Sequence, residues 1–438
     1  MNSTLPASSP PSSNSYCATL TALPAPESED DRGSLDIAVA LDISGSMSGR
    51  KLDLCKQTLE TLLGELKSTD RFSLTVFSDE AEIVVPLAGM GSVAKASALQ
   101  RVKRLHTKGC TNLSGGLTSA VQELKDVATP NAVRSVLLLT DGHANRGVSE
   151  DGAIVRLLKG CLGSDGDNIS VNVMGYGSDH NADLLQSLSQ VSETSGSYYF
   201  IEHADNVSSA FGDCLGGLLS VSAQNIRVKI QGEGVAVLHD KAVKAADDSY
   251  VVSLGDMFAD ETKDIVMTGP AVATTVRVQV EYLDVVNARP VVSQVTECTV
   301  TVGGALGGFN KHVAVQVLRV QVVRAMQEAH KLARGGLEAA RAKMTETIAE
   351  IQRVRQQMGS VSAEEAAALD TLLGDCNDAL SSMSSMYEYE GRGSKTMMSK
   401  MQMHSAQRCN ASGEEANMYR AARSKKASMV TKFAGMSR

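Results

Sequence analysis

The sequence predicts an α/β protein whose first large domain is Rossmann-like and doubly wound, followed by an antiparallel β-sandwich and a C-terminal helical region. Between residues 34 and 221, short apolar runs alternate with amphipathic segments of helical length, which is typical of a parallel sheet covered on both faces. After residue 222 the apolar residues alternate with polar ones at the period of strands. From 311 to 408 the chain is rich in Ala, Glu, Lys, Met and Arg and lacks proline, which indicates helices.

Each element of the first domain has a local signature. LDIAVALD and RSVLLLTD are continuous apolar runs, as expected for strands that are buried on both faces. RFSLTVFS and EIVVPLA are close enough in the chain to form a hairpin. The other segments carry apolar residues at helical spacing, so the predicted order is strand 35–42, helix 51–68, strand 71–78, strand 82–88, helix 92–105, helix 114–127, strand 134–141, helix 149–162, strand 168–177, helix 182–195, strand 198–202 and helix 204–221.

The remaining segments divide at changes of composition. Residues 1–13 are rich in Ser and Pro and are predicted to be disordered. Residues 14–33 contain a strand-like stretch, SYCATLTALPAP, that can pair with the sandwich, followed by a linker. The sandwich is expected over 222–310, the helices over 311–408 and a basic tail over 409–438. HVAVQVLRVQVV, at the start of the helical region, is rich enough in valine to be a strand instead.

Composition narrows the setting of the protein. A formal net charge of −8 over 438 residues gives no general attraction to nucleic acid or to an anionic membrane. No apolar run approaches the roughly 20 residues of a membrane-spanning helix, and the first residues lack the features of a signal peptide. The eight cysteines include no C-x-x-C pair, so a zinc ribbon or RING site has no support. We therefore expect a cytoplasmic protein with reduced thiols.

Three polar clusters fall where a doubly wound sheet binds ligands, beyond the carboxyl ends of its strands. Asp42, Ser44 and Ser46 follow the first strand, Thr111 lies in the loop KGCTNLSGG, and Asp141 follows the strand RSVLLLT. In an extended chain residues two apart point to the same side, so the first three can converge. Carboxylates and hydroxyls form an all-oxygen site that suits Mg²⁺, with Mn²⁺ or Ca²⁺ as alternatives. Because the hydroxyls are neutral, a bound cation would attract a further carboxylate from a partner.

The strings DISGSM, CTNLSGGL and LLLTDG, in this order, resemble the von Willebrand factor A (VWA) domain and its metal-ion-dependent adhesion site. The resemblance implies that the two serines and Thr111 ligate a metal directly and that the aspartates act through water. Residues 176–221 also resemble the plant-type VWA proteins that carry RING ubiquitin-ligase modules, and residues 222–408 resemble the region that follows their VWA domain. This chain has no Cys/His zinc module, so ligase activity is not implied by the resemblance.

His106, His143 and His180 lie in loops predicted on the same side as the metal site. None has the spacing of a ligand pair. We interpret them as the rim of a partner-binding surface. The alternative is that they are ordinary polar loop residues without a functional role.

Three functions follow from these residues. The first is a non-enzymatic, metal-dependent module that captures an acidic residue of a partner protein. The second is a substrate receptor or regulator of a ubiquitin ligase whose RING module is on another chain. The third, a metal hydrolase, is disfavoured because the chain lacks G-x-x-x-x-G-K-[ST], G-x-S-x-G and H-E-x-x-H. The sequence names neither the partner nor the oligomeric state.

Overall fold

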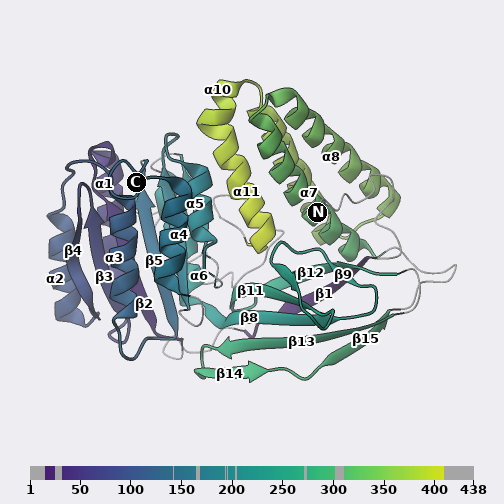
Figure 1. Cartoon of the computed structure of the whole chain (residues 1–438), viewed down its shortest axis with the longest axis horizontal. Coiled ribbons are helices and arrows are strands. Elements are labelled where there is room, and N and C mark those ends of the chain that lie inside the picture. Colours follow the sequence, from purple (N-terminus) through teal and green to yellow (C-terminus); the bar gives the residue numbers. More distant parts are fainter. Residues whose placement is uncertain are drawn as a thin grey trace.

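Three parts lie side by side in the molecule: an α/β domain, a β-sandwich and a helical region (Figure 1). The computed structural model describes residues 15–24, 32–141, 143–163, 168–192, 194, 196–202, 205–270, 274–300 and 310–408. The predictions for residues 1–13 and 409–438 lie outside the described residues.

The α/β domain is built on a six-stranded sheet with the order β4-β3-β2-β5-β6-β7. All neighbouring strands are parallel except β4, which pairs antiparallel with β3 as the predicted hairpin requires. The strands are β2 (Leu35–Asp42), β3 (Arg71–Phe77), β4 (Ala81–Gly89), β5 (Val133–Thr140), β6 (Ile169–Tyr176) and β7 (Tyr198–Ile201). The fold class expected from the sequence is confirmed, with one antiparallel edge strand added to the parallel sheet.

Helices cover both faces of this sheet, because successive strand residues point to opposite sides. Ala38 and Ala40 pack with α3 (Leu113–Lys125), α4 (Asp151–Leu162) and α5 (Ala182–Ser189). Val39 and Leu41 pack on the other face with α1 (Arg50–Glu65), α2 (Ser92–Lys103) and α6 (Asp205–Leu219). Both faces are buried, which explains why the central strands are continuously apolar.

The β-sandwich begins directly after α6. One sheet has the order β1-β12-β9, formed by β1 (Ser15–Thr21), β12 (Thr262–Thr268) and β9 (Ala236–Val237). The other has the order β10-β11-β8-β13-β14, with β15 also paired to β13; its strands are β8 (Val221–Gln231), β10 (Ala242–Lys244), β11 (Tyr250–Phe258), β13 (Thr274–Asp284), β14 (Arg289–Val292) and β15 (Thr296–Val300). All pairs in both sheets are antiparallel.

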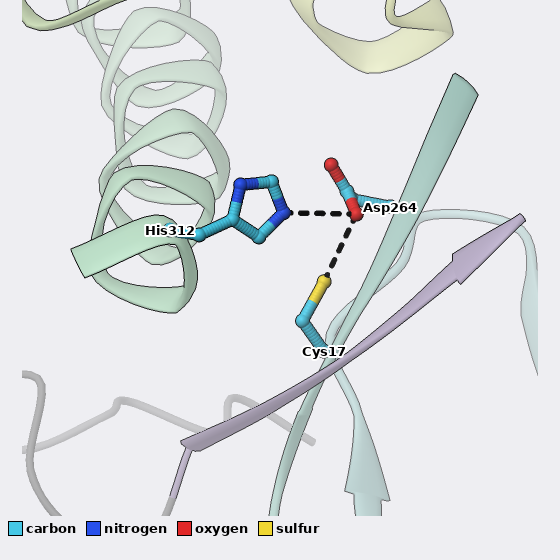
Figure 2. A group of neighbouring side chains, drawn as sticks. All are labelled: Cys17, Asp264 and His312. Carbon is cyan, nitrogen blue, oxygen red and sulfur yellow. Dashed lines mark hydrogen bonds and ion pairs between the residues drawn. The ribbon is translucent and has the colours of Figure 1, made fainter. Parts of the chain in front are cut away.

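The N-terminal strand therefore belongs to the sandwich and not to the domain that follows it in sequence. β1 pairs with β12 from Ser15↔Thr268 to Thr21↔Thr262. Both strands run beside the first turn of the long helix α7 (Lys311–Ala333) (Figure 2).

The helical region consists of α7, α8 (Leu337–Met358), α9 (Ala363–Ser382), the short α10 (Met386–Glu388), a π-helical turn at Tyr389–Gly393 and α11 (Ser394–Ala406). The valine-rich segment of ambiguous pattern is the start of α7. The Asn310 side chain caps this helix by accepting a hydrogen bond from Val313 N. Its buried residues Ala314, Leu318 and Val322 recur at helical spacing, so packing overrides the strand preference of valine. No described helix is both long enough and apolar enough to cross a membrane.

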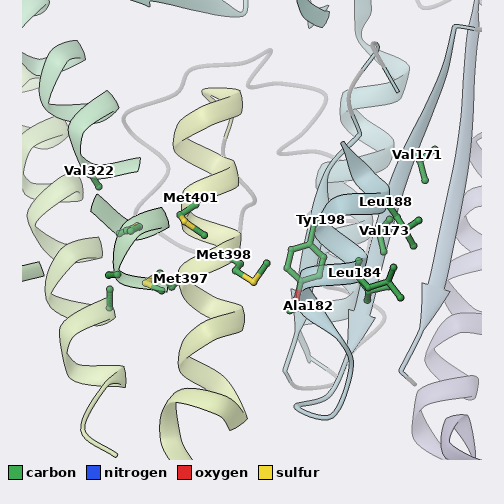
Figure 3. Close-up of a cluster of buried hydrophobic side chains, with 14 of the residues drawn as sticks. Val171, Val173, Ala182, Leu184, Leu188, Tyr198, Val322, Met397, Met398 and Met401 are labelled. Atoms are coloured by element: carbon green, nitrogen blue, oxygen red, sulfur yellow. The ribbon is translucent and has the colours of Figure 1, made fainter. Parts of the chain in front are cut away.

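α11 attaches the helical region to the open edge of the α/β sheet at β7. Met397, Met398 and Met401 of α11 are buried in the cluster that also contains Tyr198 and Leu184 (Figure 3). The methionines therefore fill a packed interface and do not form an exposed adaptable surface.

One buried side chain completes this interface. The Gln402 amide accepts a hydrogen bond from Tyr198 N at 2.8 Å and donates to the Gly196 carbonyl at 3.2 Å. These are backbone groups that a further strand would otherwise pair.

Candidate metal centre

Two aspartates meet at the carboxyl ends of the central strands. Asp42 is the last residue of β2, and Asp141 directly follows β5. Because the parallel register pairs Leu41 with Leu139, these strand ends lie next to each other. Both side chains are removed from solvent, since Asp42 is 0% exposed and Asp141 is 3% exposed.

The segment after β2 turns back over these carboxylates. Ser44 N donates to Asp42 Oδ1 at 2.8 Å, the Ser44 and Ser46 hydroxyls lie 3.1 Å apart, and Ser46 Oγ donates to Asp141 Oδ1 at 2.7 Å. An extended chain is expected here from the alternation of polar residues, but Gly45–Met47 forms a 3-10 turn. The turn brings the three side chains together, so the predicted convergence occurs through a different local conformation.

The loop that carries Thr111 is fixed against this turn by backbone bonds. Lys108 N donates to the Ile43 carbonyl at 2.7 Å, and Gly45 N donates to the Gly109 carbonyl at 3.3 Å. Gly109 has a φ of +66°, and a Cβ there would collide with the Asp79 carboxylate, so glycine is required at this position.

Thr111 itself is held from the side of β5. Its amide donates to Asn145 Oδ1 at 2.8 Å, and its carbonyl accepts from Asn145 N at 3.1 Å. Thr111 is only 3% exposed. The structure thus places all five predicted residues at one end of the sheet.

The centre concentrates negative charge in a buried place. Burial raises the pKa of Asp42, hydrogen bonds from Thr140 and Ser44 lower it, and the charge of Asp141 raises it further. The Lys51 ammonium forms an ion pair with Asp141 Oδ2 and donates to the Ser46 carbonyl at 3.3 Å. Two buried carboxylates side by side need a positive charge, and Lys51 supplies one charge for two.

The donor set fits a hard divalent cation. Two carboxylates and the hydroxyls of Ser44, Ser46 and Thr111 are all oxygen ligands, which Mg²⁺, Mn²⁺ and Ca²⁺ prefer over nitrogen or sulfur.

Comparison with known proteins identifies the domain that carries this centre. The family model of the von Willebrand factor type A domain matches residues 36–212. The chain carries a von Willebrand factor A domain. Such domains are commonly metal-dependent protein-interaction modules, mostly without enzymatic activity of their own.

Curated relatives match part of the chain. The chain is 27% identical over 248 residues to the E3 ubiquitin-protein ligase WAV3 of Arabidopsis thaliana, which covers 54% of this chain and 31% of that protein. It is 27% identical over 159 residues to inter-alpha-trypsin inhibitor heavy chain H3 of Mus musculus, covering 35% of this chain and 18% of that protein. The chain thus spans less than a third of either relative.

Solved structures share the whole arrangement of three parts. A von Willebrand factor type A protein from Catenulispora acidiphila has a TM-score of 0.63 at 14% identity and covers 91% of this chain and 97% of its own. The ArnB paralog VWA2 from Sulfolobus acidocaldarius has a TM-score of 0.55 at 16% identity, with coverage of 90% and 97%. At these identities the likeness shows the fold alone.

Sequence reasoning missed three residues of the VWA centre. Thr140 donates to Asp42 Oδ2 at 2.7 Å, Asn145 holds the Thr111 loop, and Lys51 pairs with Asp141. Thr140 could have been found from the strand register, because it lies one residue beyond the Leu41↔Leu139 pair. Lys51 lies in the first turn of α1, directly after the predicted loop, where a positive charge is unfavourable to the helix dipole. That local conflict was the available signal.

The predicted rim histidines divide into two kinds. His106 and His143 are exposed, and their role at a rim stays a prediction. For His180 the interpretation is wrong, because its side chain is 2% exposed. Its Nδ1 lies 2.7 Å from the Gly177 carbonyl and its Nε2 lies 2.6 Å from the Tyr198 hydroxyl, so both ring nitrogens are used within the core.

Proposed function

We propose that the chain is a non-enzymatic protein-binding module that captures an acidic residue of a partner through Mg²⁺ held at Asp42, Ser44, Ser46, Thr111 and Asp141. The observation that supports this most directly is the convergence of two buried carboxylates and the serine hydroxyls at the carboxyl ends of the central strands. The bound cation would supply an open coordination position for a carboxylate oxygen.

The chain's own residues prepare this site. Thr140 and Ser44 orient the Asp42 carboxylate, and Ser46 and Lys51 orient that of Asp141. The loops that border the site also carry cations: the Lys108 and Arg146 side chains are 52% and 61% exposed. Their pairs with Glu82 and Asp79, at 3.5 and 3.8 Å, are long and solvated. Exposed basic groups beside a cation site favour the approach of an acidic partner.

Calorimetric titration with Mg²⁺ and Mn²⁺ tests the metal step. Wild type should bind one ion at this centre. The affinity of Asp42→Ala for the ion should be at least about tenfold lower, which corresponds to about 1.4 kcal/mol of binding free energy. Asp53→Ala, which removes an exposed aspartate from the neighbouring helix α1, is the matched control and should bind as wild type does. Equal binding by wild type and Asp42→Ala would refute the assignment.

The partner step needs a second measurement. Proteins retained from a native lysate by wild type should be released by chelator and absent with Asp42→Ala. Partners that persist under both conditions would place the binding surface elsewhere, on the sandwich or the helices. We also propose that this binding occurs in the cytoplasm, which fractionation of cells expressing the tagged chain would test.

A second candidate function is supported by the relative in Arabidopsis, an E3 ubiquitin-protein ligase that aligns with 54% of this chain. The chain would then present substrates to, or regulate, a ligase whose RING module is on another polypeptide. Ubiquitin-conjugating and RING proteins should copurify with wild type, and Asp42→Ala should retain them while losing the substrate. If no such component copurifies, the ligase-linked function is rejected and the binding-module function is retained.

A further inference from the structure

A second cluster of metal-ligating groups lies far from the VWA centre, where three distant segments meet. Cys17 of β1, Asp264 of β12 and His312 in the first turn of α7 point toward one another (Figure 2). Cys17 Sγ lies 3.3 Å from Asp264 Oδ1, and His312 Nε2 lies 3.2 Å from the same oxygen. One ligand atom from each residue lies within 4.8 Å of the other two.

These spacings match the edges of a zinc coordination tetrahedron. Bonds of about 2.3 Å to sulfur and about 2.0–2.2 Å to nitrogen and oxygen place neighbouring ligand atoms roughly 3.4–3.6 Å apart. The two measured contacts, at 3.3 and 3.2 Å, are shorter by a few tenths of an ångström. Small side-chain rotations are therefore enough to admit the ion.

The Asp264 carboxylate is held in place because neighbouring side chains bind both the backbone and the carboxylate of Asp264. Asp264 N donates to Gln407 Oε1 at 2.8 Å, and the Asp264 carbonyl accepts from Gln407 Nε2 at 2.9 Å and from Arg319 at 3.2 Å. Thr19 Oγ1 donates to Asp264 Oδ1 at 2.5 Å. Such outer contacts orient a ligand before the metal arrives. His312 remains 52% exposed, which leaves a path for the ion and for a water ligand.

The same three residue types also occur in cysteine nucleophiles, but the arrangement here is unsuitable for one. An activated thiol needs a base beside it and a lowered pKa. Here the thiol and the imidazole both contact one carboxylate oxygen, which lies between them. Burial raises the pKa of the Cys17 thiol and the charge of Asp264 raises it further. A thiol so placed becomes a thiolate only with a cation beside it.

We propose that Cys17, Asp264 and His312 bind Zn²⁺ with a water molecule as fourth ligand. A thiolate, an imidazole and a carboxylate are a ligand set that zinc accepts and that magnesium does not. The ion would tie the N-terminal strand to the sandwich and to α7. This site is independent of the proposed VWA function, because it shares no residue with that centre.

Cobalt substitution separates this site from the VWA centre, because only a thiolate ligand gives a charge-transfer band in the near ultraviolet. The full chain, kept reduced, should show the band on addition of one equivalent of Co²⁺, and Zn²⁺ should abolish it. Asp42→Ala should keep the band, as should Cys298→Ser, which removes an exposed cysteine. Cys17→Ser should lose it. Absence of the band from wild type, or its survival in Cys17→Ser, would overturn the proposal.

A second variant guards against a folding defect in Cys17→Ser. His312 is half exposed, so His312→Ala should fold as wild type does, with an unchanged circular dichroism spectrum. Its affinity for Zn²⁺, measured against a competing chelator, should fall about 10- to 100-fold. Wild-type affinity should rise by about tenfold per pH unit between pH 7 and 8, because binding releases the thiol proton. A pH-independent affinity, or an unchanged affinity in His312→Ala, would show that the cluster is a hydrogen-bonded contact and not a metal site.

Discussion

At the residue scale, Lys51 is the side chain whose position the metal centre explains best. A lysine in the first turn of a helix is disfavoured by about 0.3–1 kcal/mol, although Asp53 lies in the same turn of α1. Its ammonium instead pairs with Asp141 and bonds to the Ser46 carbonyl. Lys51 therefore acts as a built-in counter-ion for the two buried carboxylates.

This role predicts opposite effects of Lys51→Met on stability and on metal binding. Without metal, the variant should lose about 1 kcal/mol of unfolding free energy, a modest amount because the Lys51 side chain is 39% exposed. Its affinity for Mg²⁺ should rise roughly three- to tenfold, because an ammonium no longer competes for Asp141. Denaturant unfolding and calorimetry measure the two effects, with Lys56→Met on the same helix as control. A weaker affinity would mean that Lys51 positions Asp141 for the ion.

His180 gives a prediction on pH dependence. The carbonyl of Gly177 requires a proton on Nδ1, so neutral His180 accepts the Tyr198 hydroxyl at Nε2. Burial lowers its pKa from 6.5 to about 4. Because the unfolded chain takes up the proton first, stability falls as the pH drops from 6.5 toward 4.

His180→Gln isolates this contribution. Between pH 7 and 5, wild type should lose about 2 kcal/mol more unfolding free energy than the variant does. Denaturant unfolding at a series of pH values measures the difference, and all other titrating groups cancel between the two proteins. Parallel pH profiles would show that folding does not change the pKa of His180.

Sequence predicted the residues that depend on local pattern and missed those that depend on neighbours in space. Asp42, Ser44 and Ser46 follow one strand, so their convergence needs only the strand's end and a turn. Lys51 and Thr140 reach the same point from other elements. His180 was placed on a rim because its loop is polar, but Tyr198 and Gly177 draw the ring inward.

At the scale of elements, the alternation of strands and helices was sufficient to predict the succession of elements in the VWA domain, but apart from the β3–β4 hairpin it did not predict which strands pair. β1 is strand-like in sequence, yet only the structure shows that it pairs with β12. The start of α7 illustrates the converse, because valines that favour a strand form the buried face of a helix.

Gln402 gives a test at this scale, because its amide takes the place of a further strand on β7. Gln402→Ala should remove the hydrogen bond to the buried Tyr198 N–H, at a cost of about 1–3 kcal/mol in unfolding free energy. Hydrogen exchange at that amide should accelerate, while exchange in the central strand β2 stays slow. Gln356→Ala, an exposed glutamine on α8, is the control. Unchanged protection of Tyr198 would show that the methionine packing alone shields the edge.

At the scale of the whole molecule, the end of the helical region returns to the junction of the other two parts. The Arg408 guanidinium lies 3.8 Å from the centre of the Phe258 ring, and Phe258 belongs to the core that α6 forms under the VWA sheet. The same guanidinium donates to Glu261 at 2.7 Å and to the Asp256 carbonyl at 2.6 Å. Glu261 is 1% exposed. Its burial raises its pKa, but the charges of Arg408 and Lys263 and the hydrogen bonds to the carboxylate together hold the pKa below its usual value.

This junction predicts that the three parts unfold as one unit only while Arg408 is present. Arg408→Met should leave the Glu261 carboxylate buried without its main partner and cost about 3–5 kcal/mol. The double variant Arg408→Met/Glu261→Gln should recover much of that loss, since the Glu261 charge no longer has to be desolvated, while the buried Lys263 and Asp256 are unchanged between the two variants. Denaturant unfolding followed by two probes, near-ultraviolet dichroism and exchange of the α8 amides, measures both the cost and the cooperativity. In the single variant the helical region should unfold at lower denaturant than the VWA domain. Coincident transitions in all three proteins would show that the methionine interface with β7 suffices to couple the parts.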